Sequence, residues 1–117
     1  ADNRNRPLIE EISAHLERLG HSTVCAVRDF EDWGEKQFDA RELLLHAFRA
    51  IEDSDLVLIE ATEKGMGVGI EAGFAFARNV PIVTIAKSDS DISVNLRSLS
   101  RAVITYRNIA EIAVDLA

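Results

Sequence analysis

Two sequence patterns alternate along this chain, and their alternation restricts the fold more than any other feature. Apolar residues recur at helical spacing in residues 6–20, 38–55, 70–79 and 108–117. Between them lie short apolar runs typical of strands, at residues 21–27, 56–62, 81–86 and 101–106. The run LVLIEAT at residues 56–62 is continuous, as in strands that are covered on both faces. Helices that alternate with such strands predict a parallel sheet with helices on both faces.

The predicted fold is therefore α/β, with a doubly wound parallel sheet of flavodoxin-like or Rossmann-like type in three layers. The 117 residues suit a single domain spanning 1–117. In the flavodoxin-like order the first strand lies inside the sheet, yet this sequence begins with a helix. We therefore expect a strand of roughly 5–8 residues to precede Ala1. Residues 88–100 are predicted to be a polar connection with one helical turn.

Composition argues against two classes of partner, nucleic acid polymers and membranes. The formal net charge of -7 argues against binding to a nucleic acid polymer, which needs a positive surface. No apolar run is long enough to span a membrane and no signal peptide is visible, so we expect a soluble, cytoplasmic protein without a membrane partner. The single cysteine, Cys25, is expected to be buried in a strand.

A glycine-rich segment follows the strand at residues 56–62. Gly65, Gly67 and Gly69 would form a loop at the carboxyl edge of the sheet, where ligands bind in such folds. Glycines allow the backbone to approach a ligand closely. Glu71 follows in the predicted first turn of the helix at 70–79, where the helix dipole would favour its ionised form. A fixed carboxylate there suits attack on the positively charged sugar carbon of a glycosidic transition state.

Two other interpretations of this segment remain open. Residues 67–72 fit the G-x-G-x-x-A pattern of dinucleotide-binding loops. Against this, the segment follows a later strand, and Glu71 would repel a pyrophosphate. The glycines could also serve only a tight turn, with Gly73 and Ala75 packed closely against the sheet.

The stretch SDLVLIEATEKGMGVGIEAGFAFARNVPIV resembles the core of the nucleoside 2-deoxyribosyltransferase superfamily, which includes the 2'-deoxynucleoside 5'-phosphate N-hydrolases. The matching features are Asp55 before the strand, the G-x-E-x-G-x-A pattern at 69–75 and Pro81 before the next strand. The resemblance implies that Glu71 is a nucleophile that attacks C1' of the sugar and expels the base. Water or a second base would then resolve the covalent glycosyl-enzyme, and no cofactor is implied.

The resemblance also implies a substrate site completed by a neighbouring subunit. Ser93 matches a serine that binds the 5'-phosphate of a substrate in the adjacent protomer, and Arg97 lies one turn further on. Ser93 could equally cap a short helix. Asp29 and Trp33 fall in a loop that would cover the base, although Trp33 could instead be a half-buried anchor. We expect a homodimer, and Phe74 and Phe76 point to different sides of their helix, so that one of them could meet the partner.

Two positions depart from the family pattern. Ala47 stands where the family has an aspartate that holds the sugar hydroxyls, and Gly65 stands where a polar residue is usual. Asp39, His46 or Asp53 could substitute, or could be solvated helix residues. These departures leave a second hypothesis, a nucleoside- or nucleotide-binding module that does not turn over its ligand. His15 and His21 lack the spacing of metal ligands, so no metal is expected.

Overall fold

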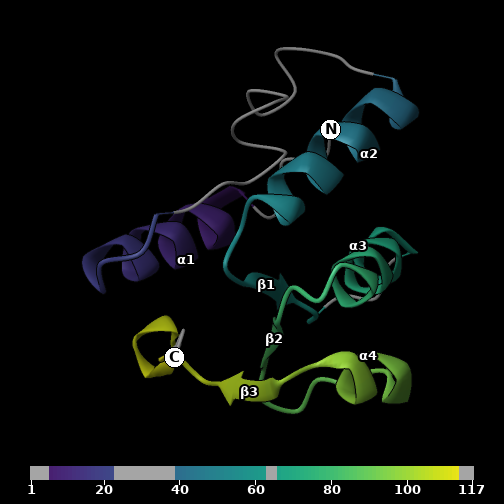
Figure 1. The fold of residues 1–117 in the computed structure, drawn as a ribbon. Coiled ribbons are helices and arrows are strands. Elements are labelled where there is room, and N and C mark those ends of the chain that lie inside the picture. The colour runs from purple at the N-terminus through teal and green to yellow at the C-terminus, as the bar shows by residue number, and fades with distance from the viewer. Residues whose placement is uncertain (1–5, 23–38, 63–65, 114–117) are drawn as a thin grey trace. The chain divides into compact units, whose positions relative to one another are not determined.

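The computed structural model describes residues 6–22, 39–62 and 66–113, and the chain divides into two compact units, residues 1–47 and 48–117 (Figure 1). The predicted loop at 28–37 and most of the predicted strand at 21–27 lie outside the described residues. The single-domain prediction and the strand proposed before Ala1 therefore stay predictions.

The first unit contains helix α1, Arg6–Arg18, as the spacing of its apolar residues predicts. The helix is terminated two residues later by Gly20, whose φ of 95° is open to glycine at little cost. The Gly20 N–H donates to the Glu17 carbonyl at 3.0 Å, and the His21 N–H donates to the Leu16 carbonyl at 3.0 Å. These two bonds form a Schellman motif, which satisfies carbonyls at the end of the helix.

Helix α2, Ala40–Glu52, begins in the first unit and ends in the second. Asp39 precedes it and accepts a hydrogen bond from the Glu42 N–H at 2.8 Å. This is the bond of a helix N-cap, which stabilises a helix by roughly 1 kcal/mol. The helix predicted over residues 38–55 is thus confirmed, with its start fixed by a short carboxylate.

The second unit is built on a parallel sheet of three strands in the order β1-β2-β3 (Figure 1). The strands are β1 (Val57–Glu60), β2 (Ile82–Lys87) and β3 (Ala102–Tyr106). In the register, Glu60 lies beside Ile85 and Lys87 lies beside Tyr106. The first five residues of β2 are buried, so both faces of the central strand are covered. The predicted parallel α/β fold is confirmed.

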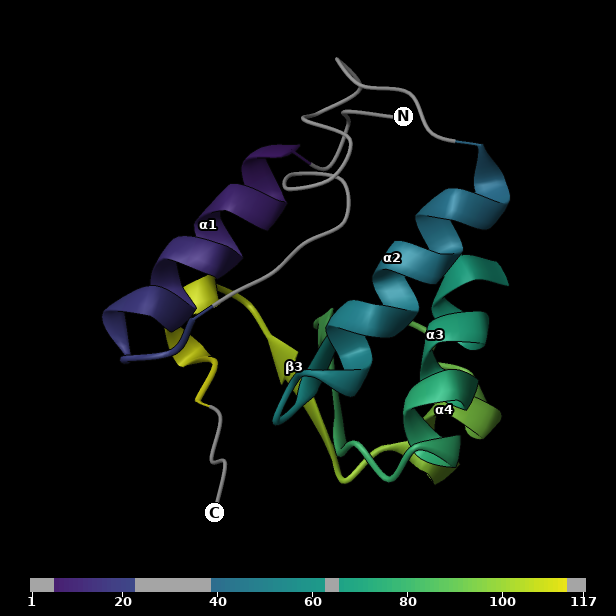
Figure 2. The same cartoon turned by 45° about the horizontal axis from the view of Figure 1, so that its top comes forward.

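Two helices of the second unit contact the sheet and each other: α3, Met66–Ala77, and α4, Val94–Leu99 (Figure 2). They cover the face of the sheet that carries Ile59 and Ile82. Buried residues of the core are Ile51, Ile59, Ala61, Ala72, Ala75, Val80, Ile82, Ala86, Ile92 and Leu96. None of the helices in the described residues is long and apolar enough to cross a membrane.

The closing helix predicted over residues 108–117 is wrong in its described part. Only a 3-10 turn forms, at Ile109–Glu111, with Asn108 as its N-cap residue as predicted. The Glu111 carboxylate accepts the N–H groups of Arg107 at 3.2 Å and Asn108 at 3.0 Å. Ile112 then takes an extended backbone and is buried, which ends the turn.

Candidate functional site

The carboxyl ends of the three strands form the edge of the sheet where the predicted site lies. Helix α3 starts at Met66, six residues after the end of β1 at Glu60, and carries the predicted nucleophile. Because strands in a parallel sheet run in the same direction, the ends of β1, β2 and β3 at Glu60, Lys87 and Tyr106 share this edge.

The glycine segment differs from the prediction. Gly67 and Gly69 lie inside α3 and not in a loop, whereas Gly65 falls outside the described residues. Among the glycines described, Gly20 is the one with a positive φ. A Cβ placed on Gly69 would have no neighbouring atom within 4 Å. Gly69 therefore gives open space over the first turn of α3 and does not provide an unusual backbone conformation.

Glu71 lies in the second turn of α3, because the helix begins four residues earlier than the sequence pattern predicts. The side chain is half-buried, and burial raises the pKa of its carboxyl group. The predicted lowering by the helix dipole is therefore wrong, since that effect fades beyond the first turn. Loss of water destabilises the ionised form of Glu71. The same lack of water strengthens the attraction of the ionised carboxylate for a cationic carbon.

The rest of α3 separates into a buried and an exposed side. Ala72 and Ala75 are buried in the core, as expected for Ala75, but Gly73 is exposed and a Cβ there would meet no atom within 4 Å. The prediction that Gly73 packs closely against the sheet is wrong, because it lies on the opposite side of the helix.

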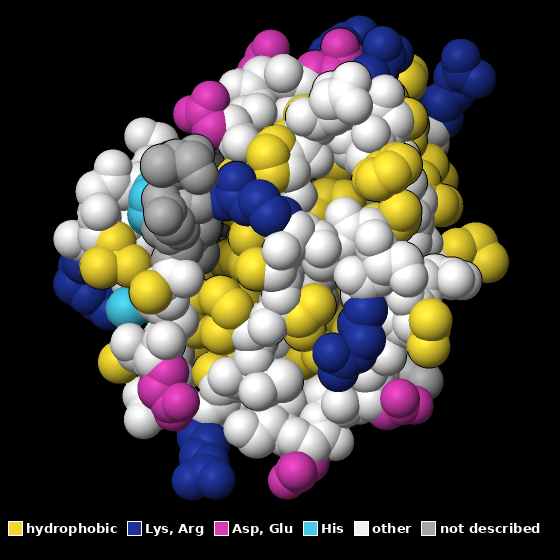
Figure 3. All heavy atoms as spheres, turned by 60° about the horizontal axis from the view of Figure 1, so that its bottom comes forward, with side chains coloured by type: hydrophobic (Ala, Val, Ile, Leu, Met, Phe, Trp, Pro, Cys, Tyr) yellow, Lys and Arg dark blue, Asp and Glu magenta, His cyan; other side chains and the backbone are white. Residues whose placement is uncertain are grey.

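The two phenylalanines of α3 lie in different environments, as predicted. Phe74 stacks on Phe48 of α2, with ring centroids 4.2 Å apart and ring planes 9° apart, and the Arg78 guanidinium lies 5.3 Å from the centre of the Phe74 ring. The Phe76 side chain is 57% exposed, and Met66 is 83% exposed. Figure 3 shows hydrophobic side chains at the surface of one face, between scattered charged groups.

A polar group at the carboxyl edge was missed by the sequence analysis. Glu60 accepts hydrogen bonds from the Thr62 N–H at 2.7 Å, from the Thr62 hydroxyl at 2.6 Å and from the Tyr106 hydroxyl. The Thr62 hydroxyl in turn accepts the Lys87 N–H at 3.0 Å. We call Glu60, Thr62, Lys87 and Tyr106 the carboxyl-edge cluster. Its signal in the sequence was that Glu60 and Thr62 are polar residues in an otherwise apolar run.

Ser93 is the N-cap of α4, where its hydroxyl oxygen accepts the Leu96 N–H at 3.3 Å. The capping interpretation is thus confirmed, while the phosphate-binding interpretation stays a prediction. Arg97 lies one turn further on in the same helix, and both side chains are exposed. Both can therefore be reached by a ligand from solvent.

The residues predicted to substitute for the missing aspartate are Asp39, His46 and Asp53. Ala47 is buried in α2, and Asp39 caps the start of that helix. His46 is half-buried and Asp53 is exposed. Asp29 and Trp33 lie outside the described residues. Within the described residues, no group of three or more His, Cys, Asp or Glu side chains could hold a metal ion.

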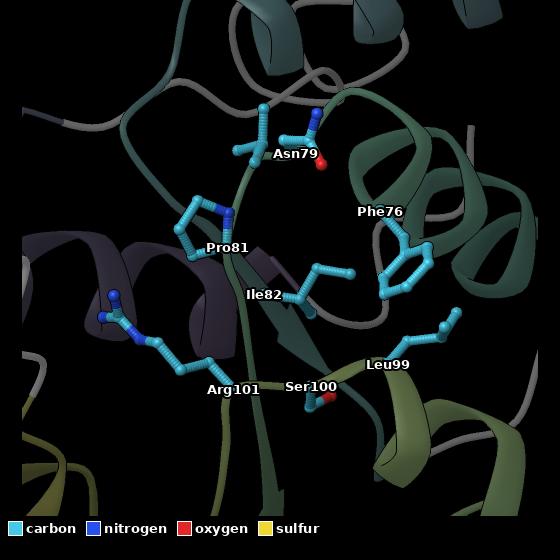
Figure 4. A pocket seen from close by; sticks show the side chains of 8 residues that line it. Phe76, Asn79, Pro81, Ile82, Leu99, Ser100 and Arg101 are labelled. Carbon is cyan, nitrogen blue, oxygen red and sulfur yellow. The ribbon is translucent and has the colours of Figure 1, made fainter.

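A cavity of about 280 Å³ lies at the opposite, amino edge of the sheet. Phe76, Ile82 and Leu99 line it together with the turn at Asn79–Pro81, and Arg101 lies at its margin (Figure 4). Since Ile82 begins β2 and Arg101 directly precedes β3, the cavity is remote from the strand ends that carry the predicted chemistry.

Comparison with known proteins supports the fold. No protein-family model and no curated protein sequence matches this chain. The structure is similar to that of Clostridium botulinum CMP N-glycosidase BcmB, with a TM-score of 0.70 and 19% sequence identity. The match covers 93% of this chain and 85% of the other. The resemblance predicted from the sequence is confirmed at the level of the fold.

Proposed function

We propose that this protein cleaves the N-glycosidic bond of a nucleoside or nucleoside 5'-monophosphate, with Glu71 as the nucleophile. The observation that carries the proposal is the position of Glu71. It is a half-buried carboxyl group in the second turn of the helix that follows β1, and this helix starts from the edge of the sheet where parallel α/β folds bind ligands. The similarity of the fold to a CMP N-glycosidase supports the same class of chemistry.

In the proposed reaction, a carboxylate oxygen of Glu71 forms a bond to C1' of the sugar while the bond from C1' to the base nitrogen breaks. The base leaves with the bonding electrons and takes a proton from water. A water molecule, or a second base, then attacks C1' and releases the carboxylate. Because the transition state resembles an oxocarbenium ion, a poorly hydrated carboxylate stabilises it strongly.

The substrate contacts are assigned by the same proposal. Gly67 and Gly69, in the first turn of α3, keep the substrate role that the sequence predicts for them. Gly67 precedes Glu71 by one helical turn, whereas Gly69 is two residues before it and faces another side of the helix. Ser93 and Arg97, both exposed on α4, would bind the 5'-phosphate from the neighbouring protomer of a homodimer. Asp29, Trp33 and Gly65 keep the roles that the sequence predicts for them. The reaction requires no cofactor.

The alternative is a nucleotide-binding module without turnover. Ala47 favours it, because a buried methyl group stands where the resembling family has the carboxylate that orients the sugar. Loss of a positioning group can lower the rate strongly even when the nucleophile is retained.

The test is release of free base, followed by chromatography, from a panel that includes CMP, the four deoxynucleosides and their 5'-monophosphates. Glu71→Gln is measured in parallel, with Glu52→Gln as the matched control because Glu52 is an exposed carboxylate at the end of α2. We expect release by the wild type and by Glu52→Gln, and a loss of at least about 10³-fold in Glu71→Gln. Full activity in Glu71→Gln would contradict the mechanism, whereas ligand binding without release would favour the alternative.

A further inference from the structure

The carboxyl-edge cluster links strands that are not neighbours in the sheet. Tyr106 belongs to β3 and Glu60 to β1, and β2 lies between them. Two strand spacings, about 10 Å, therefore separate the two backbones. Tyr106 is 2% exposed and Glu60 is half-buried, so the hydrogen bond between them is partly shielded from water. A hydrogen bond to a charged acceptor in such a place is among the stronger ones.

The cluster continues from Glu60 to the next part of the chain. Thr62 bonds Glu60 through both its N–H and its hydroxyl group, and that hydroxyl accepts the N–H of Lys87 at the end of β2. The Ala61 N–H also donates to the Ile85 carbonyl at 2.8 Å. The chain that leaves β1 is thus bonded to β2 by its backbone and to both β2 and β3 through Glu60 and Thr62.

The end of β1 is held from both faces of the sheet. Side chains alternate along a strand, so Ile59 and Glu60 point to opposite faces. Ile59 and Ala61 pack in the core with Ala72 of α3, one residue after Glu71. Glu60 is held on the other face by Tyr106 and Thr62. The position of α3, and of Glu71 within it, therefore depends on how firmly this strand end is fixed.

We propose that the carboxyl-edge cluster is a positioning device for Glu71, in which Tyr106 and Thr62 fix the end of β1 from which α3 follows. The inference rests on the proposed function for its catalytic consequence. Its structural part, that the cluster restrains the start of α3, does not depend on activity. Tyr106 and Thr62 are positioning residues, since they act through the backbone and Glu60.

Hydrogen exchange tests the structural part on the full chain. Tyr106→Phe and Thr62→Val each remove one hydroxyl group of the cluster. Thr84→Val is the matched control, because the buried Thr84 hydroxyl bonds the Ser100 hydroxyl at 2.7 Å near the opposite edge. We expect amide exchange in peptides covering residues 61–77 to accelerate about tenfold in the two cluster variants and not in Thr84→Val. Equal exchange in all three variants would overturn the inference, whether or not the wild type releases base.

Kinetics test the catalytic part with the best substrate of the panel. We expect Tyr106→Phe and Thr62→Val to lower kcat about tenfold or more while KM stays within about threefold, because misplacement of the nucleophile affects the transition state. Thr62→Ser, which keeps the hydroxyl group, should restore kcat, and Thr84→Val should leave it unchanged. Unchanged kcat in both cluster variants would overturn the positioning role. Absence of base release from the wild type would instead contradict the proposed function, and hydrogen exchange would still decide the structural part.

Discussion

At the scale of single residues, the burial of Glu71 couples folding stability to pH. Burial raises the pKa of this carboxyl group in the folded protein above its ordinary value of 4.5. Between these two pKa values the unfolded chain has released the proton and the folded chain still holds it. The folded state binds more protons there, so the contribution of Glu71 to stability falls as pH rises. The contribution is fully present below the unfolded pKa and is lost as pH rises through the folded one.

Glu71→Gln should therefore raise the free energy of unfolding at pH 7, since the amide does not ionise. We expect urea denaturation of the wild type to lose more stability than Glu71→Gln between pH 4 and pH 7. Glu52→Gln, which removes an exposed carboxylate, controls for the change in net charge. A wild type and a Glu71→Gln variant with parallel stability profiles would show that the carboxyl group is well hydrated, and would weaken the proposed site.

The same pKa direction makes a prediction for activity. If ionised Glu71 is the nucleophile, kcat/KM should fall on the acid side with the pKa of this group in the free enzyme. The pKa that limits kcat/KM at acid pH should then be higher than that of an ordinary glutamate, because burial raises the pKa of Glu71. A rate that increases toward acid pH would point to protonated Glu71 as the working form and would contradict nucleophilic attack.

Ser93 and Arg97 can be separated into structural and ligand-binding roles. Ser93→Ala removes the cap of α4 and should cost about 1 kcal/mol of stability, whereas Ser93→Asp keeps a good cap. If Ser93 lies against the 5'-phosphate, the added charge of Ser93→Asp should raise KM for the monophosphate about tenfold or more while KM for the nucleoside is unchanged. Arg97→Gln should show the same difference. If Ser93→Asp leaves the KM for the monophosphate unchanged, Ser93 serves only as the N-cap of α4.

At the scale of elements, the strands and most helices could be predicted from the sequence because their signals are local. Continuous apolar runs marked β1 and β2, and Gly20 marked the end of α1. The start of α3 could not be predicted in this way, because three alternating glycines indicate a loop by propensity. In the structure Gly67 and Gly69 are helical, and packing of Ala72 and Ala75 outweighs their weak preference.

The carboxyl-edge cluster could not be predicted for a different reason. Tyr106 and Glu60 are 46 residues apart in the sequence, so although Glu60 stands out as a polar residue in an apolar run, neither segment alone identifies its partner. Only the strand order, with β1 and β3 flanking β2, brings their side chains within reach. Likewise, the burial of Glu71 depends on how α3 packs and leaves no mark in the local sequence.

The glycines of α3 allow structure and ligand binding to be distinguished. Gly69 and Gly73 are both helical and exposed, and an added Cβ meets no atom within 4 Å at either position. Gly69→Ala and Gly73→Ala should therefore each stabilise the protein by about 1 kcal/mol, the difference in helix propensity. If the sugar lies over Gly69, the Gly69→Ala variant should also raise KM, and Gly73→Ala should not. Equal kinetics in the two variants would remove Gly69 from the substrate site.

At the scale of the whole molecule, the exposed side of α3 favours self-association. Met66, Ile70, Gly73 and Phe76 are all exposed, and Glu71, the single charged residue of the helix, is half-buried. An apolar helix surface of this kind is unusual on a monomer, and covering it with a second copy would remove its large side chains from water. A dimer is also what the proposed function needs, because Ser93 and Arg97 are expected to act on the substrate of the neighbouring protomer.

We therefore expect sedimentation of the wild type to give a dimer of about 26 kDa, twice the 12.9 kDa of the chain. Phe76→Arg should give a monomer, because a guanidinium buried without a partner costs several kcal/mol. Leu45→Arg is the matched control, since Leu45 is also an exposed, large apolar side chain but lies on α2. The monomeric variant should also lose the preference for the monophosphate over the nucleoside, because the phosphate contacts are expected to come from the neighbouring protomer. A wild type that cleaves the monophosphate as a monomer would contradict both the interface and the shared site.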